Sequence, residues 1–365
     1  MSTEPTDAPA EASVDAPALA PRTVRFRPAG LVLTVVGVLI GLPLVASGAW
    51  SLVVYSVATW HRTAHTEPVA PVVSLVADGD VDVTVDPAAT QVSVQADAWY
   101  AWEWQAPTYT ATLTGDQLEV RHTCDSFPIS PSCEAGLHVV LPPDTQLKVR
   151  TGNGHVVASD LTRAVDVSTS DGRVELARIG ADVAAHSGNG RVDVTDVTGS
   201  VTATSNDGAV VVNGATGDVP DARSGNGRVE VTGVGGSVTA SSSDGQVVVN
   251  GAGGDVTASS GNGRVEVTSV AGSVTATSSD GAVVVEDVRG DVTARSGNGS
   301  VVVYGSGLPV ALTISSGNGS QKIEAPTDPA AGTTVTIRSA DGNVSYLAPR
   351  GPSRISQAVP PVDGP

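Results

Sequence analysis

The sequence predicts an all-β protein: a single-stranded β-solenoid with about 18 residues per coil, preceded by one transmembrane helix and a β cap region. Three observations lead to this fold class. A glycine-centred phrase recurs at a nearly fixed step, apolar and polar residues alternate between the glycines, and only 3% of the residues are aromatic. Because Val and Ala supply most of the apolar side chains, the core must be thin, which favours two closely spaced sheets over a wide globular interior.

The N-terminal part predicts a tail followed by one membrane span. Residues 1–28 are rich in Pro, Ala and acidic residues without apolar periodicity, so we expect a disordered cytoplasmic tail. Residues 29–60 carry no charge, and we expect a transmembrane helix there. As a helix, residues 31–58 would reach about 42 Å at about 1.5 Å per residue, enough for one tilted crossing but not two.

The flanks of this span predict its orientation. The arginines that precede it are Arg22, Arg25 and Arg27. Since only Arg62 follows closely, the positive-inside rule predicts a single-pass protein of the cell membrane with a cytoplasmic N-terminus and an extracellular C-terminal domain. The aromatic residues expected at the outer membrane interface are Trp50, Tyr55 and Trp60. A signal peptide cleaved near residues 47–49 is the alternative.

Residues 71–150 predict an irregular β lead-in that caps the solenoid. An open solenoid end exposes unpaired strand edges and apolar core, so it needs a cover. The bulky aromatic residues that crowd this region are Trp99, Tyr100, Trp102, Trp104 and Tyr109. We expect them to pack over the solenoid end; a patch for a ligand or partner is the alternative.

Two cysteines, Cys124 and Cys133, lie in a Pro- and Ser-rich loop of this cap and are the only ones in the chain. In a domain outside the cell, an even cysteine count predicts one local disulfide. Two free thiols are the alternative. A zinc site is disfavoured because a second pair of ligands at suitable spacing is missing.

Residues 151–347 carry the repeat, and residues 348–365 form a Pro-rich tail expected to be disordered. Each copy ends on a glycine that follows Asn or Asp, and the step is 18 residues, with one of 19 between Gly208 and Gly227. The glycines are Gly154, Gly172, Gly190, Gly208, Gly227, Gly245, Gly263, Gly281 and Gly299, with looser copies at Gly319 and Gly342. We expect them to supply positive φ angles at the corners of a rod of roughly 50 Å, at about 4.8 Å per rung.

The corner residues alternate between Asp and Asn, so strict identity returns only after 36 residues. In a 36-residue coil Asp171 and Asp207 would lie directly above one another, and like charges directly opposite are destabilising. In an 18-residue coil each Asp lies beside an Asn instead. Electrostatics therefore favours the 18-residue coil, with the 36-residue coil as the alternative.

The phrases "SGNGRVEVT" and "GSVTATSSDGAVVVEDVRGDVTA", with a single anchor and a short β lead-in, resemble the bacterial candidate-adhesin β-solenoid family. This is a domain of unknown function common in actinobacterial and other Gram-positive cell-envelope proteins. The resemblance covers residues 73–347. It implies the solenoid fold, and it offers no functional residues that could be carried over.

The sequence favours no catalytic chemistry. The common nucleophile, phosphate-binding and zinc-protease signatures are missing, and we expect no catalytic pair from His155 and His186, which flank corners. Outer-face carboxylates could serve a polysaccharide-modifying enzyme, but such sites break a repeat that is uniform here. Corner Asp residues are similar to calcium-binding β-rolls, yet only one recurs per 36 residues, so we expect no metal and no cofactor, with calcium as the alternative.

The charge balance excludes one class of partner. Lys+Arg 20 against Asp+Glu 38 gives a formal net charge of -18, and nucleic acid binding needs basic clusters. The sequence therefore predicts a non-enzymatic cell-surface β-solenoid that presents an extended face for adhesion, sensing or another envelope interaction with a protein or glycan. A purely structural envelope spacer is the first alternative, and a polysaccharide-modifying enzyme is the second.

Overall fold

The computed structural model describes residues 45, 47, 49, 52, 53, 56–124 and 133–350, and the chain divides into two units, Met1–Ser56 and Val57–Pro365. The described residues of the first unit have helical backbone. Within the described part of the chain we find no helix with the length and hydropathy that a membrane crossing requires. Most of the predicted span lies outside that part, as do Arg22, Arg25, Arg27, Trp50 and Tyr55. The predicted end of the span is wrong, because Thr59 and Trp60 begin strand β1.

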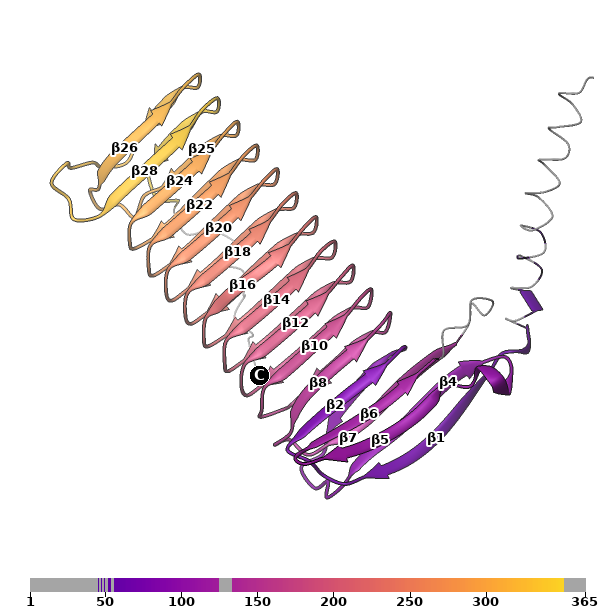
Figure 1. Ribbon diagram of the computed structural model, residues 1–365. Helices are drawn as coiled ribbons and strands as arrows, with labels where there is room; N and C mark the ends of the chain where they lie inside the picture. Colours follow the sequence, from indigo (N-terminus) through magenta and orange to yellow (C-terminus); the bar gives the residue numbers. More distant parts are fainter. Residues whose placement is uncertain are drawn as a thin grey trace, which may run out of the picture. The chain divides into compact units, whose positions relative to one another are not determined.

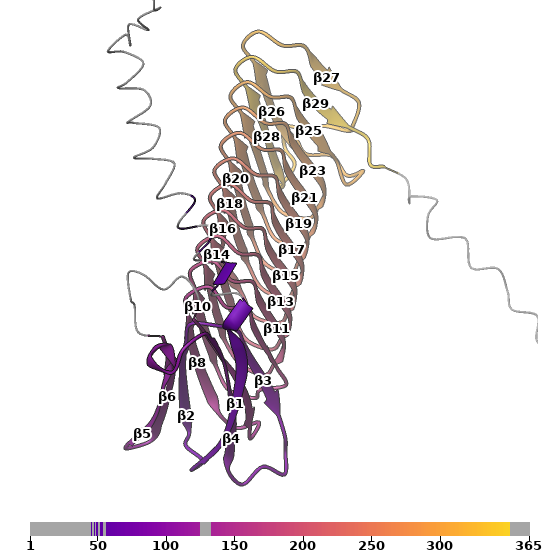
Figure 2. The same ribbon diagram turned by 90° about the vertical axis from the view of Figure 1, so that its right-hand side faces the viewer.

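The second unit contains two sheets, and from β6 (Gln117–Thr123) onward successive strands along the chain belong alternately to one sheet and the other (Figures 1 and 2). Among the described residues, sheet A has 15 strands and sheet B has 14. The successive sheet B strands of the regular part are β8 (Gln146–Thr151), β10 (Val165–Thr169), β12 (Val183–Ser187), β14 (Val201–Ser205), β16 (Val219–Ser224), β18 (Val238–Ser242), β20 (Val256–Ser260), β22 (Val274–Ser278) and β24 (Val292–Ser296). Those of sheet A are β9 (Val156–Ser159), β11 (Val174–Ile179), β13 (Val192–Val197), β15 (Val210–Ala215), β17 (Val229–Val234), β19 (Val247–Ala252), β21 (Val265–Val270), β23 (Val283–Val288) and β25 (Val301–Tyr304).

The coil is 18 residues long, as predicted. Val229 of β17 pairs in parallel with Val247 of β19, which pairs with Val265 of β21. Each rung therefore supplies one strand to each sheet. The inward positions are almost all Val and Ala, and Val229, Val231 and Ala240 are at most 1% exposed, so the core is the thin one expected from the composition.

The predicted reason for the corner glycines is wrong. None of the described corner glycines has a positive φ; instead, a Cβ on Gly263 would overlap the carbonyl oxygen of Gly245 in the preceding rung. A buried serine fixes this close approach: Ser260 Oγ donates to the Gly245 carbonyl (2.8 Å) and accepts the N–H of Gly263 (2.9 Å). Positive φ angles lie near the ends of sheet A strands, for example at Asp196 and Gly233.

The one 19-residue step is absorbed by a bulge in sheet B. Thr202 of β14 pairs with Asp221 of β16, and the register of β16 against β18 shifts between Val219 and Ala222. Pro220 lies within that shift and has no N–H to donate to the ladder. The extra residue therefore leaves the flanking rungs in register.

The N-terminal end combines regular rungs with antiparallel strands. Strands β2 (Val72–Ala77) and β3 (Val81–Val85) form a rung that stacks on β8 and β9, so part of the predicted lead-in belongs to the solenoid itself. Strands β6 (Gln117–Thr123) and β7 (Glu134–Leu141) form the next rung outward. Antiparallel strands then cover the end: β4 (Val92–Tyr100) and β1 (Thr59–Glu67) in sheet A, and β5 (Thr108–Thr114) in sheet B.

The last two rungs lie in space in the reverse of their sequence order. The rung of β28 (Thr334–Ser339) and β29 (Val344–Leu347) stacks directly on β24 and β25. The earlier strands β26 (Ala311–Ser316) and β27 (Gln321–Ile323) form the terminal rung beyond it, as Figure 1 shows for β26, β28 and β24. The chain therefore passes over one rung position after β25 and fills it on its return.

Candidate binding faces of the solenoid

A row of threonines runs along the outer surface of sheet B. Each member pairs directly with the next across neighbouring strands. The six members, called the threonine ladder below, are in spatial order Thr239, Thr257, Thr275, Thr293, Thr336 and Thr313. They point outward because their strand neighbours, such as Val256 and Ala258, are buried. The result is one hydroxyl and one methyl group about every 4.8 Å.

The strands that carry this ladder lack carboxylates. Strands β18, β20, β22, β24 and β28 contain no acidic residue, and their only charged residues are Arg295 and Arg338. Beside the ladder on the same face lie Ser241, Ser259 and Thr277. In a chain with a net charge of -18, these strands form a neutral hydroxyl strip with a basic end, bordered at the corners by Asp residues such as Asp255 and Asp244.

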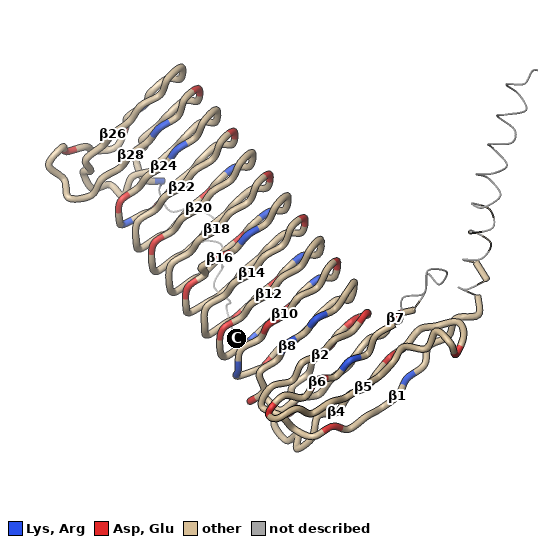
Figure 3. The backbone as a smooth tube through the Cα atoms, viewed as in Figure 1, with Lys and Arg blue, Asp and Glu red and all other residues tan. Residues whose placement is uncertain are grey.

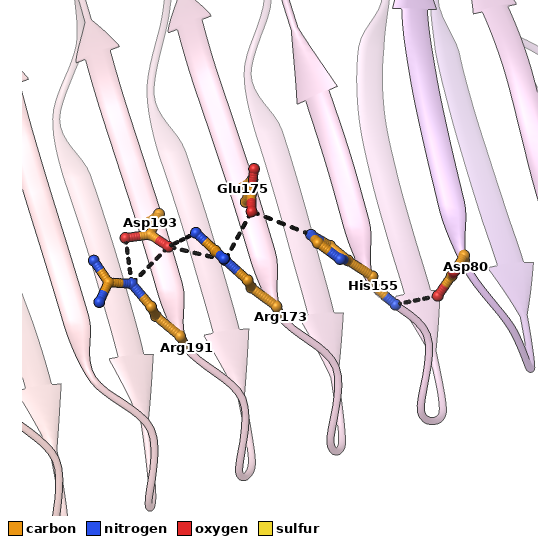
Figure 4. A network of polar contacts seen from close by, with 6 residues as sticks. All are labelled: Asp80, His155, Arg173, Glu175, Arg191 and Asp193. Atoms are coloured by element: carbon orange, nitrogen blue, oxygen red, sulfur yellow. Dashed lines mark hydrogen bonds and ion pairs between the residues drawn. The ribbon is translucent and has the colours of Figure 1, made fainter.

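The outer surface of sheet A is charged instead (Figure 4). Arg173 contacts both Glu175 (2.7 Å) and Asp193 (2.8 Å), and Arg191 contacts Asp193 (2.7 Å). His155 Nε2 lies 3.4 Å from Glu175, and the His155 backbone N–H donates to Asp80 (2.7 Å). These groups are partly exposed, and ion pairs of this kind contribute little to stability.

Further along sheet A the charged pairs become sparser. Arg228 pairs with Glu230 (3.1 Å) and Arg264 with Glu266 (3.3 Å), while Val248 lies between the two glutamates in the stack. Every one of these carboxylates has an arginine partner, which suits a charge-balanced surface. This pattern does not resemble the unpaired acid and base that hydrolysis requires.

The two histidines considered for catalysis lie apart. His155 precedes a strand of sheet A, whereas His186 lies on β12 of sheet B, where its Nδ1 contacts Thr204 Oγ1 (2.9 Å). Neither contacts the other. Among the described residues, no group of three or more His, Cys, Asp or Glu could hold a metal ion.

The corner carboxylates are used between rungs, and they appear at alternate corners in Figure 3. Asn262 Nδ2 donates to Asp244 Oδ1 in the preceding rung. At the opposite corner Asp255 accepts the backbone N–H of Ser273 (2.7 Å). These contacts give the repeated Asp residues a structural role in joining neighbouring rungs.

The aromatic residues of the cap fall into two groups. Tyr100 stacks on His61 (4.3 Å between centroids), and Tyr109 stacks on His65 (3.9 Å). The Tyr109 hydroxyl donates to Glu67 (3.1 Å), and burial together with this carboxylate raises the pKa of Tyr109. Both tyrosines therefore pack within the cap.

The tryptophans of this region are more exposed. Trp104 lies in the short 3-10 helix η1 (Glu103–Gln105) and stacks on Trp102, which precedes it, with 6.0 Å between the ring centroids; Trp104 is 58% exposed. Trp60 of β1 pairs in register with Trp99 of β4 and is 64% exposed. The five predicted residues thus do not form a single packed plug.

Cys124 and Cys133 form a disulfide, with their Cα atoms 6.0 Å apart. It closes the loop between β6 and β7, and the residues inside that loop lie outside the described part of the chain. The backbone N–H of Cys124 also donates to Asp78 (2.7 Å), which holds the start of the loop against the β2–β3 rung.

The threonine ladder was missed in the sequence although its signal is present. The phrase Val-Thr-Ala recurs in copy after copy, beginning at Val238, Val256, Val274 and Val292. Once the coil is known to be 18 residues, this phrase must stack on itself. The corresponding sheet A positions vary, for example from Glu230 to Val248 to Glu266, which makes sheet B the more uniform face.

Comparison with known proteins places the chain in a fold family. No curated protein matches it. A solved candidate cell adhesion protein of Clostridium sporogenes is 9% identical, with a TM-score of 0.21 and coverage of 79% of this chain and 100% of its own. Candidate adhesins of Bacteroides fragilis (11%, TM-score 0.27, 79% and 97% covered) and Parabacteroides merdae (9%, 0.25, 79% and 96%) are similar to the same degree.

At these identities and TM-scores the solved structures carry no functional argument. The family comparison is more direct, because the model described as Toastrack DUF4097 matches residues 75–351, most of the chain. Together with the all-β solenoid described above, this match confirms the resemblance found in the sequence, and the chain belongs to the Toastrack DUF4097 family.

Proposed function

We propose that this protein is a non-enzymatic surface protein, anchored by its N-terminal segment, whose sheet B face binds a linear glycan of the cell envelope. The observation that carries the proposal is the threonine ladder, which offers the same hydroxyl at every rung for six rungs. A polymer with evenly spaced hydroxyl groups can repeat one contact along such a surface.

The chemistry of the face suits a glycan better than a protein partner. A threonine hydroxyl donates one hydrogen bond and accepts others, as sugar hydroxyls do. Protein interfaces are usually built around Trp, Tyr and Arg anchors, and strands β18, β20, β22 and β24 carry no aromatic side chain and a single arginine, Arg295. Each contact is weak, but contacts repeated along one chain add through effective concentration.

The basic end of the face restricts the glycan further. Arg295 and Arg338 are adjacent across β24 and β28, both exposed, and no carboxylate lies on those strands. This pair favours a neutral or anionic polymer, since a cationic one would be repelled. The anchor, inferred from the uncharged residues 29–60 and the preceding arginines, would hold the face near the envelope.

A paired substitution tests the proposal. Thr257→Glu with Thr275→Glu puts two carboxylates on the ladder, whereas Thr232→Glu with Thr268→Glu puts two on sheet A as a matched control. The probe is purified insoluble cell-wall glycan, and the readout is the fraction of protein that co-sediments with it. We expect binding to fall at least tenfold in the sheet B variant only. Equal losses in both variants would reject the face, and no binding by the unmodified protein would favour the spacer.

A further inference from the structure

An apolar side chain fills one corner of every regular rung, at the end of the sheet A strand. These residues form a stacked column and are at most 9% exposed: Leu161, Ile179, Val197, Ala215, Val234, Ala252, Val270 and Val288. They close the space between the two sheets on that side. The column is continuous through the regular part of the solenoid.

The column stops where the chain leaves the regular path. The residue 18 positions after Val288 is Ser306, which lies in the segment that carries the chain from β25 to the terminal rung. The rung stacked next on β24 and β25 is β28–β29, and its strand β28 is reached by the returning chain and not directly from β25. The reversed rung order therefore leaves one corner of the solenoid incomplete.

A pocket of about 400 Å³ occupies this corner. Most of its lining is apolar, including Val292, Val303, Leu308, Val310 and Val335. Leu308 is 70% exposed, so an apolar side chain stands at the rim without cover in the described structure. This volume lies within the range of small-molecule sites, which are concave, largely apolar and marked by a few polar groups.

One polar group inside the pocket has no partner. Tyr346 is 0% exposed, and its hydroxyl finds no hydrogen-bond partner among the described residues. The hydroxyl lies against Gly305, where an added Cβ would be 2.5 Å from the oxygen, and both residues line the pocket. Burial raises the pKa of Tyr346, so the hydroxyl stays protonated and can donate. A buried tyrosine hydroxyl usually finds a partner, and a ligand oxygen would supply one.

A cation also lines this pocket. Arg289 is exposed, and no carboxylate in the described part of the chain pairs with it. The neighbouring Arg350, by contrast, contacts Glu286 (3.3 Å) and stacks on Tyr304 (4.1 Å). Arg289 is thus available for an anionic group.

We propose that this pocket binds an amphiphile with an acyl chain and an anionic oxygen head group. The acyl chain packs between Val292, Val303 and Val335, the head group pairs with Arg289, and Tyr346 donates a hydrogen bond to a ligand oxygen. This site is distinct from the sheet B face, and its ligand need not be a glycan. The same chemistry is found in free fatty acids and in acyl lipids.

Photo-crosslinking of the full chain tests the site. The probe is decanoic acid carrying a chain diazirine, added to the protein in zwitterionic vesicles, with labelled peptides mapped by mass spectrometry. We expect labelling within residues 288–310 or 333–346, competed by decanoate at least fivefold better than by decanol. Competition by vesicles that contain an anionic acyl lipid would identify the lipid as the source, and failure of those vesicles to compete would identify the free acid.

Variants make the result decisive. Arg289→Gln should reduce labelling at least fivefold and Val335→Phe should abolish it by filling the pocket, whereas Arg295→Gln on sheet B is the matched control. Labelling that is unchanged in the Arg289 and Val335 variants, or that maps to peptides outside these two ranges, would overturn the proposal. So would labelling that occurs only after residues 351–365 are removed, because the chain's own C-terminal segment would then be the occupant. None of these outcomes depends on glycan binding.

Discussion

Asn318 donates a hydrogen bond through Nδ2 to the carboxylate of Asp341, which follows it by 23 residues and lies in the adjacent rung. In sequence the last corners read Asp280, Asn298, Asn318, Asp341, but in space the order is Asp280, Asn298, Asp341, Asn318. The reversed rungs thus preserve the alternation of Asp and Asn. The reversed chain path therefore keeps each corner Asp beside an Asn and avoids placing two corner carboxylates next to each other.

Asn298→Asp should destabilise the C-terminal rungs. The new carboxylate would lie between Asp280 and Asp341, with like charges on both sides at neutral pH. We expect a loss of about 0.4–2 kcal/mol, from two unfavourable contacts of about 0.2–1 kcal/mol each. Thermal melts at low and at 1 M salt check this, since salt screens the repulsion. Asn298→Ser, which loses the hydrogen bond without adding charge, is the control; an equal, salt-independent loss in both would contradict the electrostatic explanation.

The same alternation shows what could be predicted from the sequence. The 18-residue coil followed from the unfavourable stacking of Asp171 on Asp207, and the thin core followed from Val and Ala. The reversed order of the last two rungs could not be predicted, because Gly319 and Gly342 look like ordinary corner glycines in the sequence. The consecutive Asn298 and Asn318 were the available signal. The pocket could not be predicted from the sequence either, because it arises from an omitted corner and not from a motif.

The predicted role of the corner glycines is wrong for a related reason: the contact that requires them is not local. The glycine pattern predicts positive φ, a property of the local backbone, whereas a glycine is required at position 263 by its contact with Gly245 one rung away. Such an inter-rung contact becomes visible only once the rungs are stacked. The cap aromatic residues likewise look like one group in the sequence, although Tyr100 is buried and Trp104 is exposed.

Ser260→Ala should reduce stability by about 1 kcal/mol or more, because it leaves the partly buried Gly245 carbonyl and Gly263 N–H without their shared partner. Ser259→Ala, one residue away on the outer surface, should change stability by less than about 0.5 kcal/mol. Urea unfolding of both variants measures the difference. A Ser259 variant as unstable as the Ser260 variant would show that the buried hydroxyl has no special role.

Removing a single rung should reduce stability more, per rung removed, than removing two rungs. Deleting residues 247–264 joins Gln246 to Val265 and places Asp244 beside Asp280, while deleting residues 247–282 places Asp244 beside Asn298. Both proteins should fold, because each rung contacts mainly its neighbours. Per rung removed, the shorter deletion should lose more stability at low salt. A cooperative melt for the longer deletion alone would contradict the 18-residue coil.

The disulfide should stabilise the cap. Cys124→Ser with Cys133→Ser releases a loop with a sequence separation of 9, and we expect a loss of about 2–3 kcal/mol in the chain-entropy model. Thiol labelling of the native protein without reductant should find no free cysteine. Quantitative labelling at both positions would show that the bond is not formed in the mature protein.

The proposed membrane anchor leads to a separate prediction. Protease added to intact cells should remove the chain beyond about residue 65 and leave a short membrane-bound fragment, since the arginines before residue 29 favour a cytoplasmic N-terminus. Cytosolic markers should stay intact in the same sample. A domain released into the medium and beginning near Trp50 would instead indicate cleavage of a signal peptide.

The most direct test of glycan binding compares two deletions of equal size. Removing residues 247–282 takes Thr257 and Thr275 out of the threonine ladder, whereas removing residues 174–209 takes out two rungs beyond the ladder; both keep the alternation of Asp and Asn. The measurement is the affinity of each protein for purified cell-wall glycan in a co-sedimentation titration. The account predicts that the first deletion weakens binding at least tenfold and that the second binds like the unmodified protein. Equal affinities for the two shortened proteins would contradict it.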